Sequence, residues 1–300
     1  MKKIIFFVVL AVAACSLSAQ SGTGHSGSVL WKISGKDLAK PSFLLGTFHL
    51  KSGEFLDSIP GAIAAFQSCE QVVGELNLSD MAGMQLQLQQ AMMMTPDTTY
   101  KMLFSDENYM FVSEKIASTL GAGLEQLSMF KPAALQLMVV ALAYTKFFPD
   151  FNPANVLDAR VQSDAVKADK TVQAFETVDD QIRILFGIMN LQRQAEVLLC
   201  SMQHLEKSMT MIPELIDDYN RGDLDKLYQL MKESDDCPST PEEEDAVNKD
   251  RNLAWMKKLP EIMREKSSFI AVGAIHLAGE EGLLNLLEKS GYKVEPITDK

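Results

Sequence analysis

A short motif occurs twice in this chain, once near each end. An apolar run is followed by Gly46, two further residues and His49, and a second apolar run is followed by Gly273, two residues and His276. Each run predicts a buried strand, and the glycine at its end permits a turn or a close backbone approach. Each histidine is therefore expected just beyond a strand tip, where open α/β sheets hold ligands. Two of the chain's four histidines share this setting, which indicates a paired site.

The first residues have the layout of a secretory signal peptide. Lys2 and Lys3 precede an apolar stretch that is too short for a stable membrane-spanning helix. Two cleavage patterns are compatible with it: removal of residues 1–19, or removal of residues 1–14 so that Cys15 becomes a lipidated N-terminus. Both place the mature protein of a bacterium outside the cytoplasm, either periplasmic or anchored to the cell envelope. Residues 20–28, rich in Ser and Gly, are expected to form a flexible leader.

The charge balance restricts the partners of the chain. The formal net charge is −12, which argues against nucleic acid, because that binding needs a basic surface to displace counterions from phosphates. No second long apolar span follows the first, so membrane contact is expected only through a lipid on Cys15. Cys69, Cys200 and Cys237 form no Cys-x-x-Cys pair, and their disulfide pairing stays open.

The two ends of the chain are expected to be rich in β-structure and the middle to be helical. Apolar runs predict strands at 29–34, 42–50, 71–76, 268–273 and 292–297, and a helix at 279–289. Between about 79 and 266 the periodicity is helical, interrupted by one strand at 171–177. We therefore expect a single α+β domain of α/β-like character over residues 29–300. Its β-rich ends join into one core, and the helical middle covers that core.

A divalent metal would explain the paired histidines. A catalytic metal needs a few neutral imidazoles or carboxylates and an open position for water, whose pKa the metal lowers toward neutral. His49 and His276 would supply the imidazoles, and Glu75, at the end of a predicted strand, would supply a carboxylate. Zinc, manganese and cobalt all accept such ligands, so the sequence does not choose among them.

Four residues are expected to take part in the chemistry. Glu75 and Glu176 both lie at the ends of predicted strands and could act as a general base. Arg251 could stabilise a developing oxyanion or a substrate carboxylate through its planar fork of donors, and Asn252 could orient water or a ligand. Each has a structural alternative, since a carboxylate can bind a backbone amide at a strand end and Arg251 can form an ion pair on a charged helix.

These landmarks together resemble the TraB/GumN family, which includes the TIKI metalloproteases and is related to erythromycin-esterase-like and ChaN-like proteins. The resemblance rests on the two Gly-x-x-His motifs, on the acidic strands at 72–76 and 172–177, and on Asp250-Arg251-Asn252 with Trp255 before the last buried strand. It covers most of the mature chain. It implies a TraB/GumN-like domain, a bound metal and hydrolysis of peptide bonds by metal-activated water.

The leading hypothesis is thus an extracytoplasmic metal-dependent hydrolase, a TIKI-like peptidase. Two alternatives follow from the same resemblance: a non-catalytic protein that binds a peptide or a small molecule, and an esterase similar to the erythromycin esterases. Other enzyme classes lack their motifs, because the chain has no His-Glu-x-x-His, no Gly-x-Ser-x-Gly and no glycine-rich nucleotide loop.

Overall fold

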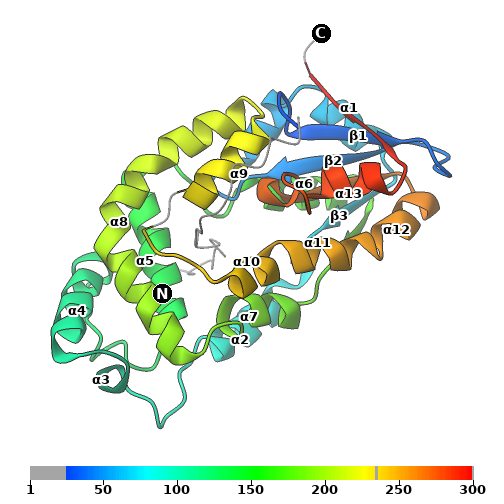
Figure 1. Cartoon of the computed structure of the whole chain (residues 1–300). Coiled ribbons are helices and arrows are strands. Elements are labelled where there is room, and N and C mark those ends of the chain that lie inside the picture. The colour runs from blue at the N-terminus through cyan, green and yellow to red at the C-terminus, as the bar shows by residue number, and fades with distance from the viewer. Residues whose placement is uncertain (1–24, 234–235, 299–300) are drawn as a thin grey trace.

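The computed structural model describes residues 25–233 and 236–298, so the expected signal peptide, Cys15 and residues 20–24 lie outside the described residues. Its centre is a six-stranded mixed sheet in the order β4-β3-β5-β2-β1-β6 (Figure 1). The strands are β1 (Leu30–Ser34), β2 (Ser42–Thr47), β3 (Gln71–Gly74), β4 (Thr171–Ala174), β5 (Ser268–Gly273) and β6 (Lys293–Pro296). Both chain ends build this sheet, which confirms the expected fold class.

The two strands that carry the repeated motif are neighbours. β2 and β5 are buried over their whole length and pair in parallel, in a register that sets the two motif glycines one position apart. β3 pairs in parallel with both β5 and β4. The carboxyl ends of four parallel strands therefore meet at one edge of the sheet. The segments that follow these ends carry four predicted site residues: His49, Glu75, Glu176 and His276.

Three of the four parallel strands that end at the site stop earlier than the sequence predicts. β2 stops at Thr47, β3 at Gly74 and β4 at Ala174, each two or three residues before its expected end. Near the end of β2, the backbone carbonyl of Gly46 accepts from the hydroxyl of Tyr219 at 2.8 Å. Beyond β3 and β4 the two segments stay joined by backbone hydrogen bonds, from the amide of Phe175 to the carbonyl of Gly74 at 3.0 Å and from the amide of Glu176 to the carbonyl of Glu75 at 2.9 Å. The segments that carry Glu75 and Glu176 are therefore held side by side.

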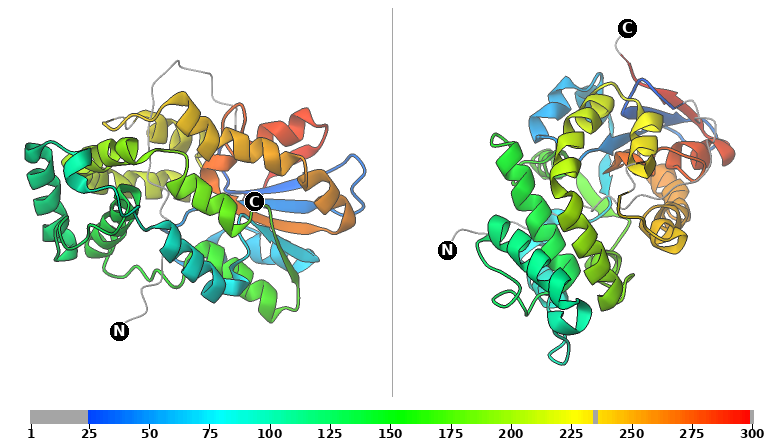
Figure 2. Two further views of the ribbon diagram at one scale, coloured as in Figure 1. Left: turned by 90° about the horizontal axis from the view of Figure 1, so that it is seen from below. Right: turned by 60° about the vertical axis from the view of Figure 1, so that its left-hand side comes forward.

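The helices form two groups (Figures 1 and 2). The first supplies apolar side chains to the core around the sheet and consists of α1 (Ala62–Ser68), α6 (Leu157–Lys167), α9 (Leu224–Glu233), α11 (Lys249–Met256), α12 (Leu259–Glu265) and α13 (Leu283–Lys289), with the short helices η1 (Gly53–Ser58) and η3 (Ala274–His276). The second consists of α2 (Met81–Ala91), α3 (Tyr100–Leu103), α4 (Asp106–Leu120), α5 (Pro132–Phe147), α7 (Val178–Phe186) and α8 (Leu191–Asn220). Short helices η2 (Leu78–Asp80) and α10 (Pro241–Val247) connect elements.

The second group forms a lobe beside the sheet with apolar clusters of its own (Figure 2). The long helix α8 joins the two groups, since its last turn places Tyr219 in the core around the sheet. The apolar helix α5 is buried in this lobe, where its Gln136 donates to the hydroxyl of Ser201 at 2.8 Å. In the described part of the chain, no helix is long and apolar enough to cross a membrane.

A disulfide fastens the segment before α10 to α8. It joins Cys200 to Cys237, while Cys69 is buried and free. At the start of the described residues, the last part of the expected flexible leader is packed against the fold instead. The amide of Gly27 donates to the carbonyl of Gly222 at 2.9 Å, and the hydroxyl of Ser28 donates to the carbonyl of Ile297 at 2.7 Å. These backbone partners hold residues 27 and 28 in place.

Candidate functional site

Three predicted residues converge around Gly273, the glycine that ends β5. A Cβ atom at this glycine would lie 3.3 Å from Oε1 of Glu75, 3.6 Å from Cδ2 of His276 and 3.9 Å from Nε2 of His49. The amide of Gly273 donates to Oε1 of Glu75 at 2.7 Å, which fixes that carboxylate at the strand tip. Two histidines far apart in the chain thus meet beside an acidic group, as the repeated motif predicts.

His49 is oriented by Asp158, a residue that the sequence analysis missed. Nδ1 of His49 donates to Oδ2 of Asp158 at 2.9 Å, and the hydroxyl of Thr47 donates to Oδ1 at 2.6 Å. Asp158 lies in the first turn of α6, 109 residues from its partner, so no local pattern reveals the pair. Its carboxylate sets the tautomer of His49 and leaves Nε2 facing the site.

His49 is also the more accessible of the two histidines. Its side chain is 31% exposed, and its Nε2 has no hydrogen-bond partner among the residues described. Burial lowers the pKa of His49, but the charge and hydrogen bond of Asp158 outweigh burial and raise the pKa to about 9. An imidazole with a free nitrogen, backed by a carboxylate, can exchange a proton with a bound molecule.

His276 has the opposite surroundings. Its side chain is 2% exposed and its ring packs against Trp255, with 4.5 Å between ring centroids. Nδ1 donates to Oδ1 of Asn252 at 2.8 Å, and the amide of Asn252 is itself fixed by donating to the carbonyls of His276 and Glu281. Burial, followed by the charge of Arg251, lowers the pKa of His276 to about 3, so the ring is neutral. Asn252 therefore positions a histidine rather than a water.

Arg251 lies at the centre of the site, and its side chain is only 3% exposed. Nη1 donates to Nε2 of His276 at 3.0 Å and to the carbonyl of Val247 at 3.3 Å. Nη2 donates to Glu75 at 2.5 Å and to Glu176 at 2.9 Å, and Nε donates to Glu176 at 2.7 Å. A guanidinium has five N–H donors, and all five have partners here. In this arrangement Arg251 has no N–H left for an oxyanion.

The two predicted glutamates have different surroundings. Glu75 faces the histidines. Burial raises its pKa, but the charge of Arg251, the two histidines and the hydrogen bond from the amide of Gly273 together outweigh burial and lower the pKa to about 2, so the group is an anion. Glu176 accepts from Arg251, from Nε1 of Trp255 at 2.9 Å and from Gln181 at 2.5 Å. Within the described residues no hydrogen bond joins Glu176 to either histidine. Glu176 therefore holds Arg251, and Glu75 is the carboxylate that lies beside both histidines.

The predicted metal ligands do not fit a divalent ion as they are arranged here. The only lone pair of His276 that could bind a metal, on Nε2, accepts from Arg251, and both oxygens of Glu75 already accept hydrogen bonds. This leaves His49 and the unused lone pairs of Glu75, fewer than the three protein ligands of a catalytic zinc site. Among the described residues, no group of three His, Cys, Asp or Glu side chains is placed to hold a metal.

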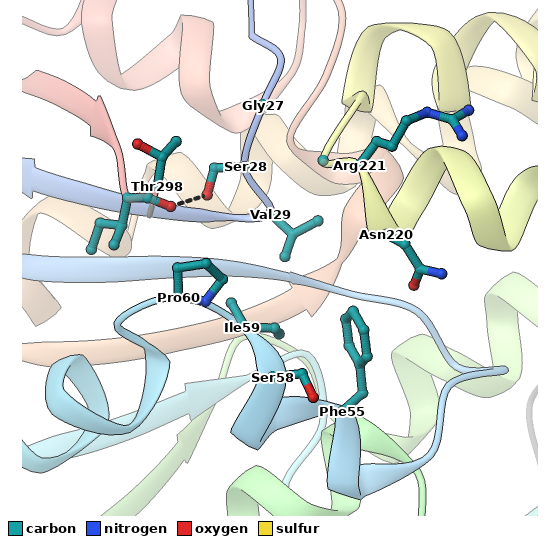
Figure 3. A pocket seen from close by; sticks show the side chains of 12 residues that line it. Gly27, Ser28, Val29, Phe55, Ser58, Ile59, Pro60, Asn220, Arg221 and Thr298 are labelled. Atoms are coloured by element: carbon teal, nitrogen blue, oxygen red, sulfur yellow. Dashed lines mark hydrogen bonds between the residues drawn. The ribbon is translucent and has the colours of Figure 1, made fainter. Parts of the chain in front are cut away.

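A pocket lies elsewhere, between the start of the described chain and the end of α8 (Figure 3). Val29, Phe55 and Ile59 supply apolar side chains to it, and Asn220 and Arg221 supply polar ones. None of the predicted site residues lines this pocket. It therefore contributes nothing to the chemistry around Gly273.

Comparison with known proteins finds metalloproteases among the relatives of this chain. Curated relatives include metalloprotease TIKI1 of Homo sapiens, 26% identical over 94% of this chain and 64% of the relative, and metalloprotease TIKI2 of Danio rerio, 26% identical over 89% and 60%. A metalloprotease TIKI homolog of Nematostella vectensis is 23% identical over 89% of the chain and 66% of the relative. The chain thus spans just under two thirds of the length of these relatives.

No solved structure shows a significant match. The family match, in contrast, extends over residues 29–296 and includes every site residue described above. Because this match covers most of the chain, the chain belongs to the TraB/PrgY/gumN family.

Proposed function

We propose that this chain is a hydrolase that cleaves peptide bonds at the site around Gly273. The observation that carries the proposal is the free Nε2 of His49, backed by Asp158 and placed beside the anionic Glu75. A nucleophile or base held by a carboxylate on its far side is the common arrangement of hydrolytic sites. The name of these relatives, metalloprotease, supports a peptide as the substrate.

His49 can move the proton that hydrolysis requires. The neutral form of His49 is the base, and its pKa of about 9 makes that form the minor one at pH 7. In this form a water bound between His49 and Glu75 loses a proton to Nε2 as its oxygen forms a bond to the carbonyl carbon, so the rate is expected to rise with pH toward 9. The C–N bond then breaks, and the same proton passes from Nε2 to the leaving amine. Glu75, which Arg251 and the amide of Gly273 hold in place, orients the water as a hydrogen-bond acceptor. His276 and Asn252 position this frame and do not touch the reacting atoms.

Two features support a compartment outside the cytoplasm. The first residues have a signal-peptide layout, and the disulfide between Cys200 and Cys237 suits an oxidising environment. We therefore propose that the chain acts on peptides in the periplasm or at the cell envelope. A lipid on Cys15 would keep it at the membrane surface.

A library of fluorescence-quenched peptides tests the proposal directly. The mature chain is expected to cleave a subset of peptides, with the products identified by mass spectrometry, and His49→Ala is expected to abolish cleavage while the melting temperature stays unchanged. His204→Ala on α8 is the matched control, because that histidine pairs with Asp236 outside the site. If the folded wild-type chain binds peptides but cleaves none of the peptides, lactones or other esters offered, the alternative of a binding protein replaces this proposal.

A further inference from the structure

We propose that the guanidinium of Arg251 is the resident cation of this site and takes the place of a divalent metal, so that the chain works without one. The inference deepens the proposed function, and it concerns the charge that the two glutamates face. Glu75 and Glu176 both point at Arg251, from the segments just after β3 and β4. Buried carboxylates need a positive partner, and here one side chain serves both.

Arg251 is hydrogen-bonded to two of the side chains that a metal would need as ligands. His276 offers its only free lone pair, on Nε2, to Nη1 of Arg251, because its Nδ1–H is committed to Asn252. Turning the ring to release Nε2 would break both bonds. Glu75 binds Nη2 with one oxygen and the amide of Gly273 with the other. A divalent ion among these ligands would also sit against a fixed positive charge.

Arg251 is held too firmly to make room for an ion by a small movement. Each of its five N–H groups has a partner, and its planar group lies over the indole of Trp255 at 4.9 Å from the ring centroid. Trp255 is in turn stacked on Phe175, with 5.2 Å between centroids, and donates to Glu176. Displacing the guanidinium would therefore leave two buried carboxylates without their counter-charge.

Metal binding to the mature chain tests this inference independently of any cleavage. The protein is first freed of metal with a chelator and dialysed, and then titrated with Co²⁺ and with Zn²⁺, while absorption of Co²⁺ and bound metal per chain are measured. We expect that the wild type does not bind one equivalent of metal at this site. Any weak metal binding should be equally strong in the wild type, in His49→Ala and in His276→Gln. Thermal melting of each variant verifies that it is folded.

One equivalent of metal in the wild type that is lost in either folded variant would overturn the inference. If His276→Gln does not fold, His49→Ala still tests the inference, because His49 is the more exposed of the two histidines. Where cleavage is detected, we also expect chelator to change its rate by less than twofold, and a tenfold loss restored by added metal would contradict the inference. If no peptide is cleaved, the proposed function fails while the titration still decides what cation the site holds.

Discussion

The two copies of the Gly-x-x-His motif look alike in sequence and have opposite surroundings in the fold. His49 is partly exposed, bonds to a carboxylate and keeps Nε2 free, whereas His276 is buried, bonds to an amide and gives its Nε2 to Arg251. The raised pKa of His49 and the lowered pKa of His276 follow from these partners. The strand and glycine place each ring at the sheet edge, but residues from helices α6 and α11 decide what each ring can do.

The largest expected effect is on catalysis at His49. If His49 carries the proton, His49→Ala should lower kcat/KM for a cleaved peptide by about 10³-fold, which corresponds to about 4 kcal/mol. The melting temperature should change little, because the ring is partly exposed. Steady-state kinetics beside a thermal melt measure both quantities. If His49→Ala retains a tenth of the wild-type activity, His49 does not transfer the proton in the reaction.

His276 should contribute mainly to stability. His276→Ala leaves Nη1 of Arg251 and Oδ1 of Asn252 without their partner in a buried place and also creates a cavity. We expect the free energy of unfolding to fall by about 2–4 kcal/mol, measured by urea denaturation. An unchanged midpoint, together with an unchanged slope, would show that the network around Arg251 is not formed in solution.

The carboxylate behind His49 should matter for turnover more than for binding. Asp158→Asn keeps the shape of the partner and removes its charge, so we expect kcat to fall by about 10²-fold with little change in KM. Asp164→Asn on the same helix is the matched control, since that residue pairs with Arg160 and Lys167 away from the site. Equal losses in the two variants would mean that the change acts through α6 as a whole.

The smallest expected effect lies at Trp255, on the His276 side. Trp255→Phe removes the hydrogen bond from Nε1 to Glu176 and keeps an aromatic ring beneath Arg251. We expect a loss of about 1 kcal/mol in the free energy of unfolding and an unchanged kcat. A fall in kcat comparable to that of Asp158→Asn would show that the surroundings of His276 matter for turnover as much as those of His49.

Much of this site could be predicted from sequence because its residues follow buried strands. The apolar runs before Gly46 and Gly273 indicate strand ends, and parallel pairing brings such ends together. The expected fold class follows from the same β-rich ends and helical middle. Glu75 and Glu176 could be named for the same reason, since each lies just beyond the end of a short strand.

The contacts between side chains could not be predicted in this way. Asp158 comes from a helix with no repeat or motif around it, and its role depends on a bond across 109 residues. The central place of Arg251 depends on how α11 lies over the ends of three strands, which the pattern of charges from 242 to 251 does not reveal. The predicted metal set rested on residue types alone and did not include the guanidinium that lies among them.

Nitrogen NMR of the histidine rings tests the central contrast most directly. In ¹⁵N-labelled protein, with each ring assigned through its His→Gln variant, His276 should show a single neutral tautomer with the proton on Nδ1 throughout pH 5–8. His49 should be protonated over the same range, consistent with its pKa of about 9. A His276 ring protonated on Nε2, or two rings that titrate alike near pH 6.5, would contradict the assignment of opposite roles to the two histidines.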